Sequence, residues 1–478
     1  MQQGRAVTDV CYFNGENIPA RSFLRWQLPD PPPAGYEFDT INRDALLRLA
    51  GVNAARIELS TGPRYRVLVL PDSSALTPEV ATRLSDLVHA GATVMGPPPR
   101  CSPSLTDFPA ADTIVRQVTE DLWGDLDGVH RTVRSVGSGL VIWGRPLGQV
   151  LESLGVFPDV DCSIQDGTIQ WTHRTGPGWD LYFISNQSSC ERRVELTLRV
   201  SGRIPELWYP DTGAIESLAM WHESGGRTTI DLPMDPNGSV FILFATPADD
   251  RRVVGLFPQA PGSSLEAVRL ARVAGTIQAT VAKPGSWLVE ESSGAQSLIE
   301  VGNVPAPLIL HGPWTLTFRE RLAVPLRLHL DALVSWTELR HAAARYFSGT
   351  AEYVVEFVLP AELMSPDQRL LLDLGTVHEL AAVQLNGTDL GILWKPPFTI
   401  DITAAALSGH NVLRCQVTNT WRNRIIGDHG KPAAERTTFI DPMLRLGKPW
   451  LPGGLGATLS PAGLLGPVSV RAAIMRTL

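Results

Sequence analysis

The sequence has few of the features by which metals, membranes or nucleic acids are bound. Only 5 of its 478 residues are cysteine, and no two are spaced as Cys-x-x-Cys, so neither a zinc site nor a disulfide framework is expected. No run approaches the roughly 18 apolar residues of a membrane-spanning helix. The formal net charge of −8 disfavours nucleic acids and anionic membranes as partners, because both are bound through basic patches.

Several enzyme motifs are also absent. The sequence contains no His-Glu-x-x-His pair of a zinc hydrolase, no Gly-x-Ser-x-Gly nucleophile elbow and no phosphate-binding P-loop. Its start, Met-Gln-Gln-Gly-Arg, lacks the charged and then apolar pattern of a secretion signal, and the compartment is left open. With 44% apolar and 19% charged residues, the composition is that of a folded protein with room for several domains.

Residues 61–158 are predicted to form a flavodoxin-like α/β layer. Arg66–Pro71 is a continuous apolar strand, Thr77 is a suitable helix N-cap, and Ala92–Gly96 returns as a second strand. A strand, a helix and a strand in this order imply a parallel pair, because the crossover helix carries the chain back. A further strand at Leu140–Trp143 and a helix near Leu147–Leu154 complete this layer.

The rest of the chain is predicted to be all-β. Arg192–Val200 alternates apolar and polar residues, and Pro205–Glu216 has a strand, an Asp-Thr-Gly turn and a return strand. These patterns predict a β-sandwich with a linking β segment over 159–308.

Residues 309–478 are predicted to form an antiparallel β-sandwich or jelly roll. Asn386-Gly387 favours a tight hairpin because both residues tolerate positive φ. Phe398–Ile402 and Val412–Val417 alternate with a period of two, as half-buried strands do.

Several motifs in one order resemble a known family. They are VQLNG, DLGILWKPPF and DIT within Val383–Thr403, Gly-x-Asn-x-Leu at Gly409–Leu413, and VTNTWRNRIIGD at Val417–Asp428. Ser335–Arg340 and Tyr346–Phe357 fit the same pattern. The stretch resembles the galactose-binding-like jelly roll of glycoside hydrolase family 2 and, more closely, the C-terminal portion of glycoside hydrolase family 106, the α-L-rhamnosidases.

The resemblance implies what the complete enzymes do. They look like inverting, calcium-dependent hydrolases of terminal α-L-rhamnose in polysaccharides, typically periplasmic or secreted. The α/β layer is similar to a glutamine-amidotransferase-like domain, although no nucleophilic cysteine follows a strand here. Residues 1–60 look like the remnant of the closing part of a catalytic β/α barrel. The alternative is that they are the first β-α unit of the next domain.

No catalytic residue is assigned. Glycoside hydrolysis needs two carboxylates flanking the scissile bond, and the family's catalytic glutamates and calcium ligands precede the segments matched here. We therefore expect no cofactor or metal ligand in this chain. The other candidate carboxylates, better explained as strand faces or turn caps, are Glu206, Glu352, Glu356 and Asp428.

Two groups of residues are candidates for binding a glycan. Aromatic faces stack on sugar rings, and carboxylates and amides pair with hydroxyls. The first group, which would lie at the mouth of a barrel, consists of Tyr36, Asp39 and Asn42. The alternative for Asp39 and Asn42 is that they cap the following helix. The second lies in the jelly roll, where core packing or domain docking is the alternative for its tryptophans; its members are Trp394, Trp421, Arg422 and Asn423.

The sequence therefore predicts the non-catalytic C-terminal part of a glycoside hydrolase resembling α-L-rhamnosidases. Its expected partners are a rhamnose-containing oligo- or polysaccharide and the missing catalytic barrel. Two alternatives stay open. One is a stand-alone carbohydrate-binding or scaffolding module without hydrolysis, and the other is a complete glycosidase whose carboxylate pair lies between its β domains.

Overall fold

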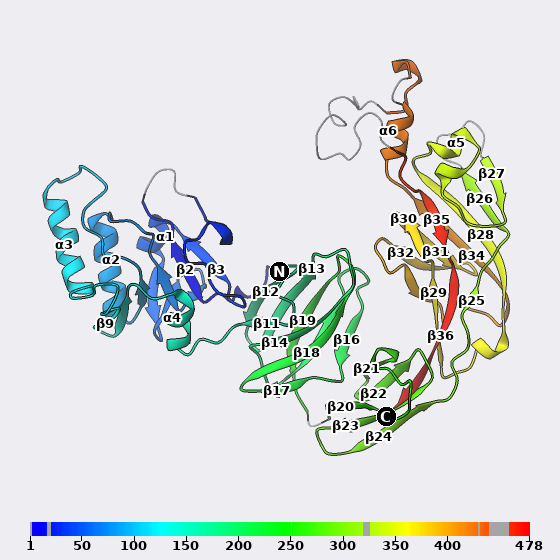
Figure 1. Cartoon of the computed structure of the whole chain (residues 1–478), viewed down its shortest axis with the longest axis horizontal. Coiled ribbons are helices and arrows are strands. Elements are labelled where there is room, and N and C mark those ends of the chain that lie inside the picture. The colour runs from blue at the N-terminus through cyan, green and yellow to red at the C-terminus, as the bar shows by residue number, and fades with distance from the viewer. Residues whose placement is uncertain (1, 17–20, 250, 319–325, 429–430, 439–457) are drawn as a thin grey trace. The chain divides into compact units, whose positions relative to one another are not determined.

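A computed structural model describes residues 2–16, 21–249, 251–318, 326–428, 431–438 and 458–478. The chain forms two compact units, Met1–Arg252 and Val253–Leu478 (Figure 1). The division falls inside the range 159–308, where we expected a sandwich followed by a linking segment. The described residues are rich in strands, in agreement with an α/β region followed by all-β regions.

The first unit contains a six-stranded sheet in which every neighbouring pair is parallel except the last. In spatial order its strands are β3 (Phe38–Ile41), β2 (Val10–Phe13), β7 (Val67–Val69), β8 (Thr93–Met95), β10 (Gly139–Ile142) and β9 (Val133–Val136). The parallel pairing of β7 with β8 confirms the predicted strand–helix–strand unit.

Helices cover both faces of this sheet. One face packs against α1 (Arg43–Arg48), α2 (Pro78–His89) and α3 (Ala110–Leu122), and the other against α4 (Leu147–Ser153). The strands are apolar on both sides because each side is buried, as parallel sheets require. Helix α3 was not predicted, because its apolar positions are few and its surface is largely exposed.

The boundary expected at residue 60 does not coincide with an edge of this sheet. Strand β2 lies between β3 and β7 and pairs with both, so residues on either side of position 60 share one core. The start of the chain contributes elsewhere: β1 (Arg5–Ala6) pairs with β12 (Ile169–Gly176) of the neighbouring β-sandwich. The backbone N–H and C=O groups of a strand need hydrogen-bond partners, and both β1 and β2 pair with strands of this unit.

A small antiparallel sheet follows α1. It consists of β4 (Ala50–Asn53), β5 (Arg56–Leu59) and β6 (Arg64–Tyr65). The β4–β5 turn places Ala54 and Ala55 at φ 49° and 57°, a conformation that two-residue hairpins require but alanine disfavours. The turn therefore has no sequence signal, which is why this sheet was not predicted.

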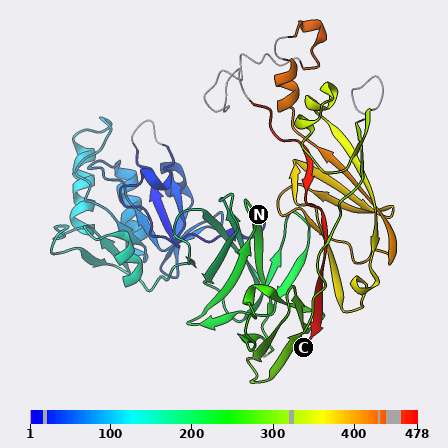
Figure 2. The same ribbon diagram turned by 45° about the vertical axis from the view of Figure 1, so that its right-hand side comes forward.

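The β-sandwich of the first unit has two antiparallel sheets around one core (Figures 1 and 2). Val194, Leu196 and Leu198 alternate into it as predicted. One sheet runs β1, β12, β13 (Trp179–Asn186), β19 (Ser239–Pro247), β15 (Arg203–Trp208) and β16 (Ile215–Leu218). The other runs β11 (Val160–Cys162), β14 (Arg192–Leu198), β18 (Arg227–Met234) and β17 (His222–Ser224).

The second unit has a six-stranded antiparallel sheet facing a second sheet across a shared core. The first runs β27 (Leu326–Leu330), β26 (Trp314–Phe318), β28 (Thr350–Leu359), β34 (Gly409–Thr418), β31 (Leu380–Leu385) and β32 (Thr388–Leu393). The second runs β21 (Val268–Val273), β22 (Thr276–Val281), β36 (Ser469–Thr477), β29 (Gln368–Asp373) and β33 (Thr399–Asp401), with β25 (Leu308–Ile309) also on β36.

Smaller elements complete the second unit. They are the sheet of β20 (Val253–Pro258), β23 (Gly285–Glu291) and β24 (Gln296–Val301), the pair β30 (Thr376–His378) and β35 (Gly463–Gly466), and the helices α5 (Ala342–Arg345) and α6 (Arg422–Asp428). The predicted hairpin is confirmed: β31 and β32 pair across Asn386 and Gly387, both at positive φ. Residues 253–308 are tied to the later strands because β36 pairs with β22, β25 and β29.

Candidate functional site

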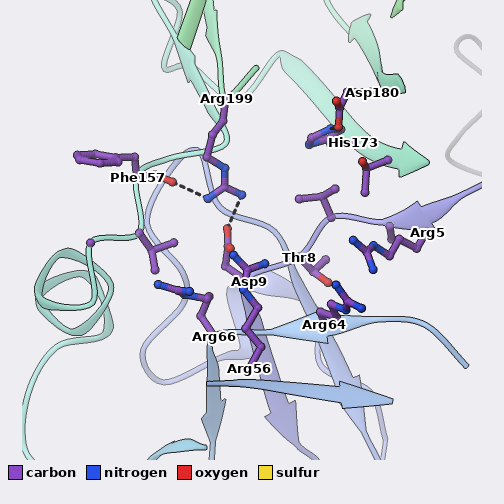
Figure 3. A pocket seen from close by; sticks show the side chains of 15 residues that line it. Arg5, Thr8, Asp9, Arg56, Arg64, Arg66, Phe157, His173, Asp180 and Arg199 are labelled. Carbon is purple, nitrogen blue, oxygen red and sulfur yellow. Dashed lines mark hydrogen bonds and ion pairs between the residues drawn. The ribbon is translucent and has the colours of Figure 1, made fainter. Parts of the chain in front are cut away.

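A polar cavity of about 310 Å³ lies in the first unit, where its α/β part meets its β-sandwich. Backbone and side chains of Arg5–Asp9 form one wall, and β5, β6 and the loop after α4 form others. Figure 3 shows five arginines arranged around Asp9. They are Arg5, Arg56, Arg64, Arg66 and Arg199.

Asp9 and Arg199 form the centre of the cavity wall. Arg199 Nη2 donates to Asp9 Oδ2 at 2.9 Å, and Nη1 donates to the carbonyl of Phe157 at 2.9 Å (Figure 3). Asp9 is buried, and its carbonyl accepts from the backbone N–H groups of Arg66 and Val67. The negative charges of Asp159 and Asp9 outweigh the effect of burial and raise the pKa of Arg199.

His173 lies beside this pair, held between two carboxylates. Its Nδ1 is 2.8 Å from Asp159 Oδ2 and its Nε2 is 3.3 Å from Asp180 Oδ1. The ring stacks on Tyr182, whose hydroxyl donates to Asp159. Burial alone would lower the pKa of His173, but hydrogen bonds and charges from Asp159 and Asp180 outweigh it and raise that pKa. The site therefore favours an imidazolium that donates to both aspartates.

The remaining arginines approach from the small sheet and from β1. Ile57 pairs with Tyr65 and Glu58 with Arg64, and Arg56 and Arg66 both adjoin the last of these pairs. Arg64 is held by Glu58, whose Oε1 accepts at 2.7 Å, and Arg66 donates to the carbonyl of Leu154 at 3.0 Å. Burial, followed by the charge of Arg66, lowers the pKa of Arg56.

This arrangement suits the binding of negative charge better than acid–base chemistry. The lining residues include five arginines but only two carboxylates, a surplus of three positive charges before His173 is counted. Both carboxylates already have partners, Asp9 in Arg199 and Asp180 in His173 and Arg203. Both carboxylates therefore serve as ion-pair partners within the cavity wall.

Two of the expected substrate-binding residues lie behind this cavity rather than in its lining. Asp39, on β3, accepts from the hydroxyls of Thr8 at 3.1 Å and Tyr65 at 3.0 Å. Tyr36 is buried, and its hydroxyl donates to the carbonyl of Val156 at 2.7 Å. Both support residues of the cavity wall through hydrogen bonds.

Asn42 lies apart from them. Its side chain accepts from the backbone N–H of Ala45 at 2.9 Å and so caps α1, which was the alternative role considered for it. Asp39 does not cap this helix, because it lies within β3. Asn42 also borders a second cavity, of about 1070 Å³, near the first turns of α1 and α2.

The second cavity lies at the carboxyl ends of β2 and β7, where ligands of doubly wound sheets bind. The N-terminus of α2, an anion site in many such folds, is here occupied by the protein's own carboxylate. Glu16 accepts from the backbone N–H of Thr77 at 2.6 Å, from its hydroxyl at 2.8 Å and from Arg43 at 2.9 Å.

The expected residues of the second unit divide into exposed and buried ones. Trp394 is 54% and Trp421 is 45% exposed, so core packing is the wrong role for both. Trp394 follows β32 and Trp421 follows β34, and the strand register brings both to the same end of the sheet. Arg422 opens α6, and Asn423 is buried and exchanges hydrogen bonds with the backbone of Ser460.

The remaining candidate carboxylates have structural partners. Glu206 accepts from Thr246 and Trp208, Glu352 lies 3.7 Å from Arg414, and Glu356 lies 3.1 Å from His410. Asp428 is buried and accepts from Thr437 and Thr438. Burial opposes ionisation of Asp428, but these hydrogen bonds lower its pKa overall.

The structure adds two findings on metals and membranes. Within residues 2–16, 21–249, 251–318, 326–428, 431–438 and 458–478, no group of three or more His, Cys, Asp or Glu side chains is placed to hold a metal ion. None of the helices described is long and apolar enough to cross a membrane. The five cysteines are unpaired thiols.

Reasoning from sequence missed the arginine-lined cavity and His173. Arg64 and Arg66 flank Tyr65 with the period of a strand, so they share a face, and this was the one local signal available. Arg5, Arg56 and Arg199 come from distant segments that carry no shared pattern. Their convergence depends on the fold alone.

Comparison with known proteins places the chain near the glycoside hydrolases. Residues 1–222 match the family model of glycoside hydrolase family 106, described as alpha-L-rhamnosidase. A rhamnosidase structure from Novosphingobium sp. PP1Y aligns with 98% of this chain at a TM-score of 0.76 and 29% identity, over 39% of its own length. A Formosa agariphila protein named "Putative beta-glucuronidase" is 23% identical over 100% of this chain and 56% of its own length.

The chain is thus a glycoside hydrolase-like protein that resembles a rhamnosidase in structure. It spans 56% of the curated relative and 39% of the rhamnosidase chain. The family match covers residues 1–222, whereas most of the motifs behind the predicted resemblance lie beyond them. The assignment of 309–478 as a galactose-binding-like jelly roll therefore stays a prediction.

Proposed function

We propose that this chain is the non-catalytic C-terminal part of a glycoside hydrolase that removes terminal α-L-rhamnose from glycans. The observation that carries the proposal is the alignment of 98% of this chain, at a TM-score of 0.76, with 39% of a rhamnosidase chain. The match of residues 1–222 to the alpha-L-rhamnosidase family model supports the same assignment.

The finer architecture belongs to this proposal. Numbered by their order along the chain, the five parallel strands lie in the spatial order 2-1-3-4-5, which corresponds to β3, β2, β7, β8 and β10. This order supports a flavodoxin-like layer of the glutamine-amidotransferase-like kind. The two facing antiparallel sheets of the second unit support a galactose-binding-like jelly roll. On this proposal the catalytic glutamates and the calcium ion belong to a β/α barrel outside this chain, and the enzyme is periplasmic or secreted.

The carboxylates of this chain support a non-catalytic role. Retaining and inverting glycosidases both need two carboxyl groups facing one sugar-sized space. The two that line the arginine-lined cavity, Asp9 and Asp180, are each bound to cations. Glu206 and Asp428 are hydrogen-bonded to neighbouring side chains or backbone.

The test is hydrolysis of aryl α-L-rhamnosides by the purified 478-residue chain. We expect no turnover above the buffer rate, with or without added calcium. Turnover that Asp9→Asn, Glu206→Gln or Asp180→Asn abolished would contradict the proposal and favour a complete glycosidase.

A second candidate function is a carbohydrate-binding module that works without hydrolysis. The exposure of Trp394 and Trp421 at one end of a sheet favours it, because flat indole faces stack on sugar rings. We expect Trp394→Ala and Trp421→Ala to weaken binding of a rhamnose-containing polysaccharide, measured by affinity electrophoresis. Trp26→Ala, at a 78% exposed tryptophan of the first unit, is the matched control and should bind as wild type does.

A further inference from the structure

We propose that the arginine-lined cavity binds a small, doubly charged tetrahedral oxyanion, a sulfate or phosphate group, with Arg5, Arg56 and Arg66 as its main charge partners. The proposal does not depend on the proposed function, since it concerns charge and space within the first unit alone. None of the family resemblances assigns a ligand to this cavity.

The first argument is the unbalanced charge. The protein carries a net charge of −8, yet five arginines converge on one small cavity. Arg199 and Arg64 are neutralised by Asp9 and Glu58. In the part of the chain that the structure describes, no carboxylate lies within ion-pair distance of the other three arginines. Arg66 donates to the carbonyl of Leu154, and the charge of Asp9 acts on Arg56, but neither contact is an ion pair. The cavity therefore keeps a surplus of positive charge.

The second argument is the opposition of like charges. Arg56 in β5 and Arg66, the residue after β6, both adjoin the last residue pair of these two strands, and both are positively charged. Like charges at close range repel each other. Burial together with the charges of Arg66, Arg199 and Arg64 lowers the pKa of Arg56. A guanidinium stays protonated throughout the physiological range, so the protein bears this repulsion until an anion relieves it.

The third argument is that the cavity wall is held in place before a ligand arrives. Arg199 is fixed by Asp9 and by the carbonyl of Phe157. Arg66 is fixed through its backbone N–H to Asp9 and through its side chain to Leu154. Groups held in a fixed arrangement lose little conformational entropy on binding.

Charge and volume select the ligand class. One carboxylate is satisfied by a single arginine fork, whereas sulfate and phosphate offer more oxygens and a second charge to several arginines. The cavity, about 310 Å³, has about ten times the ~30 Å³ that a water molecule occupies. It therefore admits a tetrahedral oxyanion with its waters, or with the sugar ring that carries it.

The experiment is calorimetric titration of the whole 478-residue chain at constant ionic strength. The probes are sodium sulfate, sodium phosphate, a monosaccharide sulfate and, as the singly charged comparison, sodium acetate. We expect sulfate or phosphate to bind, free or on the sugar, and acetate to bind at least about tenfold more weakly. Binding of the free ions identifies a free oxyanion as the ligand, and binding of the sugar sulfate alone identifies an esterified one.

Variants separate this site from general salt effects. Arg56→Gln should weaken sulfate binding at least about tenfold, while the melting temperature without sulfate stays equal or rises because a repulsion is removed. Arg5→Gln is the second variant, used if Arg56→Gln does not fold. Arg116→Gln makes the same charge change on the exposed surface of α3 and should leave the affinity unchanged.

Four results would overturn the proposal, three from the titrations and one from melting. The first three are no heat of binding with any doubly charged probe, acetate binding as tightly as sulfate, and an equal loss of affinity in Arg116→Gln and Arg56→Gln. A lower melting temperature of both Arg56→Gln and Arg5→Gln without ligand would mark these arginines as structural partners, and would also contradict it.

Discussion

Asp9 and Arg199 are 190 residues apart in the sequence and form an ion pair at 2.9 Å. Asp9 directly precedes β2 of the parallel sheet, and Arg199 directly follows β14 of the β-sandwich. The pair therefore joins the two parts of the first unit at the centre of the arginine-lined cavity. Arg199 also lies 3.5 Å from Asp159, which connects it to the buried His173.

Removing the arginine of this pair should destabilise the first unit. In Arg199→Gln, the carboxylate of Asp9, a residue only 6% exposed, loses its cation, and we expect a loss of about 2–4 kcal/mol in the free energy of unfolding. The measurement is the urea midpoint of the transition of this unit. Arg193→Gln is the control: its ion pair with Asp231 is exposed and should be worth less than about 1 kcal/mol. Equal shifts in the two variants would show that the buried pair is unimportant.

His173 should make the stability of the first unit depend on pH. Its pKa is raised in the folded protein, since the hydrogen bonds and charges of Asp159 and Asp180 outweigh the opposing effect of burial. A raised pKa means that the stabilisation is complete below the ordinary histidine value of 6.5 and is lost as the pH rises through the folded-state pKa.

The check is the difference in melting temperature between wild type and His173→Gln from about pH 5.5 to 8.5. We expect this difference to be largest at the acidic end and to shrink as the pH rises. His222→Gln, at an exposed histidine of β17, should melt in parallel with wild type throughout. A constant difference would show that folding does not shift the pKa of His173, and a difference that grows with pH would show that folding lowers it; either result would contradict the prediction.

Glu16 should stabilise the first turn of α2. Its side chain is only 5% exposed and accepts from the backbone and hydroxyl of Thr77 and from Arg43. Glu16→Ala removes the acceptor of the Thr77 backbone N–H, whereas Arg43 keeps its contact with Glu79, so we expect a loss of about 1–3 kcal/mol. Hydrogen exchange at the backbone N–H of Thr77 should become faster in the same variant.

Glu120→Ala provides the comparison for Glu16. Glu120 lies on the exposed surface of α3, and its loss should change stability by no more than about 0.5 kcal/mol. If both variants have the same urea midpoint, then Glu16 does not stabilise α2. Unchanged exchange at Thr77 would lead to the same conclusion.

Local elements were predictable where neighbouring residues determine them. Asn386-Gly387 gave the hairpin of β31 and β32, because only a few residues adopt two successive positive φ angles. Thr77 and Pro78 marked the start of α2, and alternation along Arg192–Val200 identified β14 and its buried face. The turn at Ala54 and Ala55 has the same backbone conformation as an Asn-Gly turn but no such signal, so it was missed.

Roles of single side chains were predicted less well than elements. Asn42 was considered for a substrate or a cap, and the structure shows that it caps α1. Tyr36 and Asp39 were placed at the mouth of a barrel, whereas their hydrogen bonds hold the back of the arginine-lined cavity. The role of a polar side chain depends on which donors surround it, and those donors come from distant parts of the chain.

The sequence alone determined several of the strands and helices, among them β7, α2, β14 and the hairpin of β31 and β32, since alternation, caps and turns act over a few residues. Helix α3 and the small sheet of β4, β5 and β6 were not among them. Only the tertiary structure decided that Arg5, Arg56, Arg66 and Arg199 line one cavity and that Asp9 and His173 lie beside them. Arg5, Arg56 and His173 lie in β1, β5 and β12, whereas Asp9, Arg66 and Arg199 lie just outside strands, and no local rule relates these six residues. Charge acts through space and not along the chain, so this concentration of positive charge exists only once the chain is folded.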